Sequence, residues 1–185
     1  MSVRTSTEKK LLDAADELFF SQGIAATPVD TVLARAGVSS ATLYRAYGSK
    51  ESLVAAALAR RHRTWMTIWD GAVERAPDAR TRLLAVFDAL EEFSGRPEGA
   101  RWCAFLATAA EYAHPPEEVA AAVRLDTDSL RQRLQALAEP VVGSRADELA
   151  ESLLLVVSGA LAMRLRNPDG SARTARSIAE TLVDR

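Results

Sequence analysis

Apolar residues recur every three or four positions along most of the chain, and no stretch alternates apolar and polar residues as a β-strand would. Clusters of proline and glycine interrupt this helical spacing at several points. Two short helices are predicted on either side of Ala36-Gly37-Val38. Seven longer helices are predicted at residues 7–22, 50–74, 78–93, 98–113, 116–138, 145–166 and 172–183. The pattern therefore predicts an all-α fold of about nine helices.

The two short helices have the sequence features of a helix-turn-helix. Thr27 is placed to cap the first helix with its hydroxyl, and Pro28 suits the first helical position, where no amide donor is needed. Gly37 follows the last apolar position, where a left-handed residue ends a helix and turns the chain. Ser39 is placed to cap the second helix. An ordinary helical hairpin with a solvated polar face has the same spacing, so the pattern alone leaves that alternative open.

The second short helix separates residues that pack from residues that point outward. Leu43 and Tyr47 are four positions apart and share one face. The opposite side carries Arg45 beside small and hydroxyl-bearing residues, which are types that contact base edges or phosphates in a major groove. We expect Arg45 to read a base. The candidate DNA-binding residues are Thr27, Ser39, Ser40, Ala41, Thr42, Tyr44, Arg45, Tyr47 and Lys50.

The segment ATLYRAYGSKESLVAAAL, with the AGVS turn before it, resembles the signature of the TetR (tetracycline-repressor-like) family. The resemblance covers roughly residues 7–58. It implies an N-terminal three-helix DNA-binding domain in which Tyr44 and Lys50 contact phosphates. Asp30 departs from the family pattern, because this helix often presents a basic residue to the DNA backbone. We expect this acidic side chain to weaken nonspecific DNA affinity.

The chain has 185 residues, which leaves enough length after a helix-turn-helix for a second domain with its own core. We expect residues 1–49 to form the helix-turn-helix DNA-binding domain and residues 50–185 to form a helical ligand-binding and dimerisation domain. Residues 1–63 carry a net charge of +3 and residues 64–185 a net charge of −5. The run Arg60-Arg61-His62-Arg63 is placed to meet phosphate, although a modest cation excess is also common on solvated helices.

Features that would place the chain outside the cytoplasm are missing from its sequence. The amino terminus lacks the apolar region of a signal peptide, and no stretch approaches the roughly 18 apolar residues of a membrane span. A single cysteine excludes an internal disulfide and fits a reducing compartment. We expect a cytoplasmic protein that does not contact a membrane.

The segment SLLLVVSGALAM at residues 152–163 carries no charge and is apolar all around, so one packed face does not account for it. The last helix presents a second apolar stripe. These two helices resemble the pair through which TetR-family subunits dimerise as a four-helix bundle, although a central core helix of a monomer has the same composition. The candidate interface residues of a homodimer are Leu154, Ser158, Gly159, Leu161, Ala175, Ile178, Ala179 and Leu182.

Aromatic residues collect in the middle of the second domain, where the family resemblance implies a cavity for a largely apolar small-molecule inducer. A stripe of large side chains at helical spacing is otherwise typical of plain core. The candidate ligand-binding residues are His62, Trp65, Met66, Trp69, Phe87, Trp102, Cys103, Phe105 and Glu111. Glu111 and His114 have the spacing of a di-metal pair, but His62 is the only other histidine, so we expect no metal site and no cofactor.

Enzyme signatures are missing: the sequence has no phosphate-cradling glycine loop, no nucleophile elbow and no locally grouped catalytic triad. We therefore expect a bacterial transcriptional regulator and not an enzyme. The expected mode is a repressor that binds a pseudo-palindromic, double-stranded DNA operator as a dimer and is released by its inducer. The alternative is a helical ligand-binding or partner-binding adaptor that has kept the fold and lost operator recognition.

Overall fold

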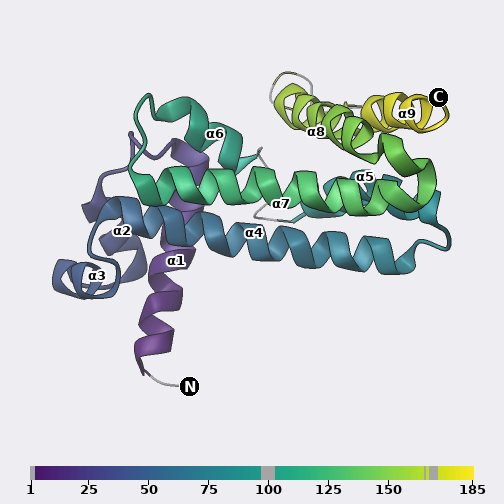
Figure 1. Ribbon diagram of the computed structural model, residues 1–185. Helices are drawn as coiled ribbons and strands as arrows, with labels where there is room; N and C mark the ends of the chain where they lie inside the picture. Colours follow the sequence, from purple (N-terminus) through teal and green to yellow (C-terminus); the bar gives the residue numbers. More distant parts are fainter. Residues whose placement is uncertain (1–2, 97–102, 165, 167–170) are drawn as a thin grey trace. The chain divides into compact units, whose positions relative to one another are not determined.

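The computed structural model describes residues 3–96, 103–164, 166 and 171–185, and every regular element in this part is helical (Figure 1). The elements are α1 (Val3–Gln22), α2 (Val29–Ala36), α3 (Ser40–Tyr47), α4 (Lys50–Arg75), α5 (Ala79–Ser94), α6 (Ala104–Glu111), α7 (Glu117–Val142), a 3₁₀ turn (Gly143–Arg145), α8 (Ala146–Met163) and α9 (Ser171–Val183). The predicted all-α fold is confirmed, and the nine predicted helices all have counterparts.

Two helix boundaries differ from the prediction for identifiable reasons. A helix was expected to end before Pro140, yet α7 continues to Val142 with Pro140 inside it. Proline disrupts a helix by removing one amide donor and crowding the preceding turn, and here the helix ends two residues later. The helix expected at residues 98–113 corresponds to α6, which is shorter; residues 98–102 lie outside the described part.

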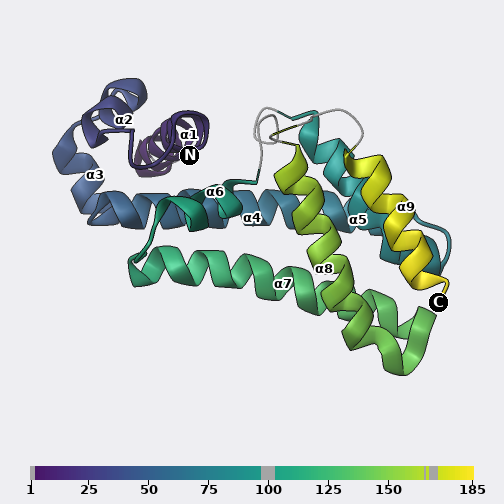
Figure 2. The ribbon, with the colours of Figure 1, turned by 90° about the horizontal axis from the view of Figure 1, so that it is seen from above.

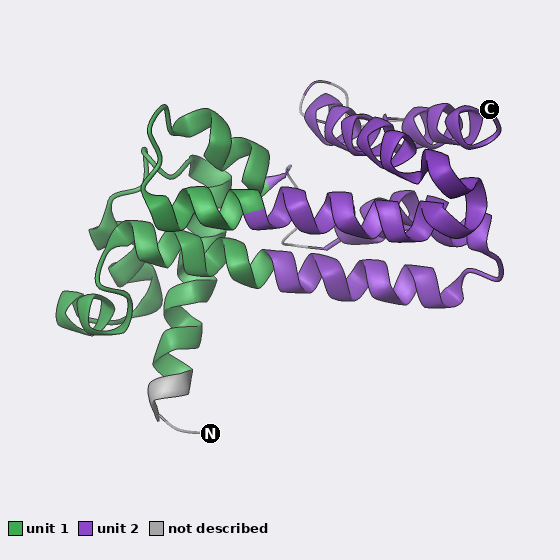
Figure 3. Ribbon diagram, viewed as in Figure 1, with its two compact units in different colours: residues 1–61, 104–124 green, residues 62–103, 125–185 purple. Residues whose placement is uncertain are grey.

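The chain forms two compact units that do not follow the expected division at residue 49 (Figure 3). Unit 1 contains residues 1–61 together with residues 104–124, and unit 2 contains residues 62–103 and 125–185. The helices α4 and α7 each contribute to both units. The segment at residues 104–124, which was expected in the ligand-binding domain, therefore belongs to the same unit as the helix-turn-helix.

Unit 1 has its own hydrophobic core, built from α1, α2, α3, the start of α4, and the segment containing α6. The apolar stripe predicted on α1 is buried, and it includes Leu11 and Phe19 at 0% and 1% exposure. Leu43 of α3 is fully buried against this core. Ala104 of α6 and Val119 of α7 also belong to it, which explains why this segment groups with unit 1.

Unit 2 packs α5, α8 and α9 with the second parts of α4 and α7. Helices α8 and α9 lie side by side, and α5 contacts α9 (Figures 1 and 2). The largest fully buried side chain in this core is Trp69 of α4. The described part of the chain has no helix both long enough and apolar enough to span a bilayer.

Candidate nucleic-acid interface

The turn between α2 and α3 has the geometry that its glycine predicts. Gly37 adopts a left-handed conformation, with φ at +65° and ψ at +41°. Its amide and the amide of Val38 donate to carbonyls in the last turn of α2, Ala34 and Leu33, at 3.3 and 3.2 Å. A side chain would be strained at this φ, so glycine sets the angle at which α3 leaves α2.

Helix α3 buries one face and exposes the other. Leu43 is fully buried and Tyr47 is half-buried against the core of unit 1. Burial raises the pKa of Tyr47, and the charge of Glu8 acts in the same direction. The opposite face presents Ser40, Ala41, Tyr44, Arg45 and Ala46, all exposed. This face has one guanidinium, two hydroxyls and two methyl groups available to a partner.

The start of α3 borders an open groove. Ser39 occupies the N-cap position with an extended backbone, and its hydroxyl pairs with that of Thr42 at 2.9 Å instead of capping a backbone amide. The groove has a volume of about 600 Å³ and is lined by Thr7, Glu8, Gly37, Val38, Ser39, Thr42, Arg45 and Ala46. The expected DNA contacts Ser39, Thr42 and Arg45 therefore line one surface.

The prediction for Thr27 is wrong, both as a helix cap and as a DNA contact. Its side chain is fully buried, and its hydroxyl donates to the carbonyl oxygen of Gly23 at 2.7 Å. Pro28 takes the N-cap position and α2 begins at Val29. A hydroxyl can satisfy a nearby carbonyl as readily as a helix amide, and here the carbonyl at the end of α1 binds it.

Lys50, the first residue of α4, is half-buried in unit 1. Its ammonium group donates to the carbonyl oxygen of Ile24 at 2.6 Å and lies 5.7 Å from the centre of the Phe19 ring. The ammonium has two further hydrogens that can donate to a phosphate. The expected phosphate contact of Lys50 therefore stays a prediction.

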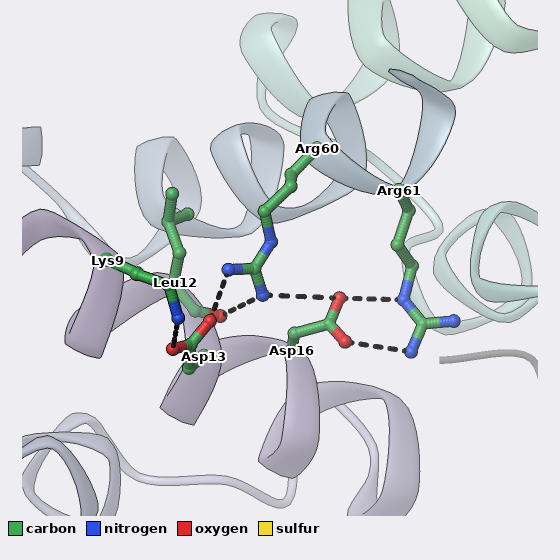
Figure 4. Close-up of polar contacts among 6 residues, drawn as sticks. All are labelled: Lys9, Leu12, Asp13, Asp16, Arg60 and Arg61. Atoms are coloured by element: carbon green, nitrogen blue, oxygen red, sulfur yellow. Dashed lines mark hydrogen bonds and ion pairs between the residues drawn. The ribbon is translucent and has the colours of Figure 1, made fainter. Parts of the chain in front are cut away.

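Three members of the basic run on α4, expected to meet phosphate, have partners within the protein. Figure 4 shows two of them, Arg60 and Arg61, in contact with α1. Arg60 donates to Asp13 at 2.6 Å and to the Leu12 carbonyl at 2.8 Å. Arg61 makes a two-point contact with Asp16 at 2.8 and 3.1 Å, and both side chains are 9% exposed. These contacts join α4 to α1 within unit 1.

His62 contacts Asp126 through its Nδ1 atom at 2.8 Å, and both residues lie in unit 2. Burial raises the pKa of Asp126, and the hydrogen bond and charge of His62 oppose that change. This histidine was a candidate ligand-binding residue, and it already has a carboxylate partner.

The other candidate ligand-binding residues fall into different units. Trp65, Met66, Trp69 and Phe87 lie in or against the core of unit 2, and Cys103 is half-buried in the same unit. Phe105 and Glu111 lie in unit 1, where Phe105 packs against the core and Glu111 accepts the amide of Ala25. Trp102 lies outside the described residues. The structure therefore does not gather the predicted set in one unit.

Some of the candidate interface residues on α8 and α9 are buried inside the protomer, and the others are exposed or partly exposed. Leu154, Ala175 and Ala179 are buried inside the protomer at 8%, 5% and 0% exposure, so their assignment to an interface is wrong. All three belong to the hydrophobic core of unit 2. Gly159 and Ile178 are exposed, while Ser158, Leu161 and Leu182 are partly exposed.

Two contacts in unit 1 were not predicted from the sequence. The pairing of Asp13 and Asp16 with Arg60 and Arg61 had a local signal, since both acids share one face of α1 at i, i+3 spacing. The bond between Glu111 and Ala25 joins residues 86 positions apart and had no local signal.

Comparison with known proteins agrees with this arrangement of helices. Residues 11–57 match the family model of the bacterial regulatory proteins of the tetR family. The fold is similar to a TetR-family transcriptional regulator from Streptomyces coelicolor, at 26% identity and a TM-score of 0.89, over 97% of this chain and 95% of that one. It is also similar to a TetR transcriptional regulator from Chloroflexus aurantiacus, at 22% identity and a TM-score of 0.81, over 100% and 98% of the two chains. The search of curated proteins found no match.

The buried and exposed faces of α3, the glycine turn before it and the helical second unit define a helix-turn-helix DNA-binding regulator. Residues 11–57 match the DNA-binding segment of the tetR family of bacterial regulatory proteins, and nearly the whole chain shares the fold of a TetR-family transcriptional regulator.

Proposed function

We propose that this chain is a one-component repressor that binds a pseudo-palindromic operator as a homodimer and is released by a small, largely apolar molecule held in its second unit. The observation that carries the proposal is the division of α3, which buries Leu43 completely and exposes Ala41, Tyr44 and Arg45. A helix held on one face and free on the other fits into a major groove.

Arg45 is the residue best suited to read a base. No carboxylate in the described part of the chain pairs with its exposed guanidinium, so the charge is available to DNA. Its planar fork matches the two acceptors that guanine presents in the major groove. Tyr44, 53% exposed beside it, has a hydroxyl that can reach a phosphate, and Lys50 is the proposed second phosphate contact.

Dimerisation is supported by an apolar stripe on the exposed side of α8 and α9. Leu155 and Met163 of α8 are 73% and 46% exposed, and Ile178 of α9 is 48% exposed. Gly159 lies between Leu155 and Met163 at helical spacing and is also exposed. Contiguous exposed apolar residues mark a surface that a partner covers. A second copy of the chain fits best, because a two-fold axis would present two α3 helices to two operator half-sites.

Ligand binding in unit 2 is supported by an aromatic cluster. Trp65 lies 5.7 Å from Trp69 and 5.9 Å from Phe93, measured between ring centres, with an edge-to-face arrangement for the second pair. The buried indole nitrogen of Trp69 has no hydrogen-bond partner among the described residues. Aromatic side chains with an unpaired donor are groups that would suit an apolar molecule carrying one acceptor.

The experiment is a binding-site selection from random duplexes with the wild type, followed by the same selection with Arg45→Ala. The wild type should enrich an inverted repeat, and the variant should lose preference at one base pair in each half-site, with a loss of about 1–3 kcal/mol in specific binding. Arg63→Ala, which removes an exposed arginine of α4, is the matched control and should keep the wild-type preference.

Unchanged base preference in Arg45→Ala would show that Arg45 does not read the operator. A wild type that enriches no sequence at all would favour the alternative, an adaptor with this fold that has lost operator recognition. Asp30 is exposed on α2 and supplies the acidic charge expected of such a chain, but an acid in the first turn of a helix also interacts favourably with the helix dipole.

A further inference from the structure

One peptide group in the loop between α1 and α2 is bound at both ends by charged side chains of opposite sign. The carbonyl oxygen of Ile24 accepts a hydrogen bond from the ammonium of Lys50 at 2.6 Å. The N–H of Ala25, which belongs to the same peptide group, donates to the carboxylate of Glu111 at 2.9 Å. The cation lies at the negative end of the peptide dipole and the anion at its positive end, so both charges favour the same orientation.

The two charges come from different elements of unit 1. Lys50 begins α4, and Glu111 is the last residue of α6. The carbonyl oxygen of Ile24 also accepts the N–H of Thr27 at 3.3 Å, and Ile24 and Thr27 are buried whereas Ala25 and Ala26 are exposed. The Ile24 carbonyl therefore has two donors, the Lys50 ammonium and the Thr27 amide, whereas the Ala25 N–H donates to the Glu111 carboxylate.

Helix α6 can hold Glu111 at this loop because it is packed in unit 1. Ala104 at its start is 3% exposed, and Phe105 and Tyr112 pack against the same core. Burial raises the pKa of Tyr112, and the nearby charges of Glu51 and Glu111 raise it further. Gly23 leaves room for the carboxylate, since a Cβ atom at that position would lie 3.3 Å from its Oε1 atom.

The loop matters for DNA binding because α2 begins four residues after Ala25. Helix α2 packs on α1, and the turn at Gly37 fixes the direction of α3 relative to α2, so a shift of α2 also shifts α3. A rotation of the Ile24–Ala25 peptide would therefore change how α2 and α3 lie against α1. Charge-assisted hydrogen bonds are stronger than neutral ones, and two on the same peptide group polarise each other.

We propose that Glu111 is a positioning residue for DNA binding, which holds the Ile24–Ala25 peptide together with Lys50 and so fixes α2 and α3 for the operator. Loss of the Glu111 contact would leave the Ala25 N–H without its acceptor, and operator affinity would fall. The effect on DNA rests on the proposed function, whereas the effect on the loop does not.

The first test measures the hydrogen-exchange rate of the Ala25 amide by NMR in the full-length protein without DNA. Glu111→Leu should accelerate this exchange about tenfold, because a hydrogen bond to a charged acceptor is lost. Glu111→Gln should accelerate it less, because its side-chain oxygen still accepts. Glu118→Leu is the matched control, since Glu118 is an exposed glutamate of unit 1 that contacts Ser52 and not the loop.

The second test measures affinity for the operator selected by the wild type. Glu111→Leu should weaken binding about 3- to 10-fold with unchanged circular dichroism, Glu111→Gln should recover part of the loss, and Glu118→Leu should bind as the wild type does. An unchanged exchange rate of the Ala25 amide in Glu111→Leu would show that Glu111 does not hold this amide. Accelerated exchange with full operator affinity would overturn the positioning role. A wild type that selects no operator contradicts the proposed function, and the exchange measurement still decides whether Glu111 holds the loop.

Discussion

Replacing Arg61 by methionine should destabilise the DNA-binding unit far more than replacing an exposed arginine. The guanidinium of Arg61 binds the carboxylate of Asp16 at two points, and its central carbon lies 4.6 Å from the centre of the Phe20 ring. Methionine keeps an apolar chain against Phe20 but leaves Asp16 without this partner. Removing one member of a buried ion pair costs about 3–5 kcal/mol. The Nη2 atom of Arg60 lies 4.0 Å from Asp16 and gives the carboxylate a second cation. We therefore expect the free energy of unfolding to fall by about 3 kcal/mol, the lower end of that range.

Arg35→Met is the matched control. Arg35 also contacts a carboxylate of α1 at two points, Glu17, but these side chains are 57% and 53% exposed. An exposed pair of this kind contributes between about 0 and 1 kcal/mol. The assay is hydrogen exchange in increasing urea, followed in peptides from α1 and, as an internal reference, from α8 in the other unit. The reasoning would be refuted if Arg61→Met and Arg35→Met lost equal amounts of exchange protection in the α1 peptides.

Two further predictions concern unit 2. Gly159→Leu should convert a dimer to a monomer of about 20.0 kDa in light scattering with its helical content retained, because a Cβ at this position meets nothing within 4 Å in the protomer; a monomeric wild type would contradict it. Burial raises the pKa of Asp126 above its usual 3.8, so the folded protein keeps this proton to a higher pH than the unfolded chain. The associated stability should be present below pH 3.8 and lost as the pH rises through the folded pKa, and urea unfolding of Asp126→Asn should lack this decline.

Local sequence signals predicted the helices and the turn of the DNA-binding unit. The position of Gly37 indicated a left-handed residue that ends α2, and the spacing of Leu43 and Tyr47 indicated the buried face of α3. These features depend on residues a few positions apart, so periodicity and turn chemistry are enough to place them.

The sequence did not predict which residues far apart along the chain contact each other. Arg60 and Arg61 looked like a basic surface because a charge pattern does not reveal partners 45 to 48 positions away. Glu111 looked like part of a ligand pocket because the segment that contains it is far from the helix-turn-helix along the chain. Ala175 and Ala179 form an apolar stripe whose direction the spacing does not determine, and that stripe faces the core of its own protomer.

The central claim is that α3 recognises a specific DNA sequence, and the most direct measurement is the ratio of two dissociation constants for the wild type. Fluorescence anisotropy at one fixed salt concentration would compare the duplex obtained by selection with a scrambled duplex of the same composition. We expect the selected duplex to bind about 10³-fold more tightly or better, as specific helix-turn-helix proteins do. A ratio near one would contradict the account.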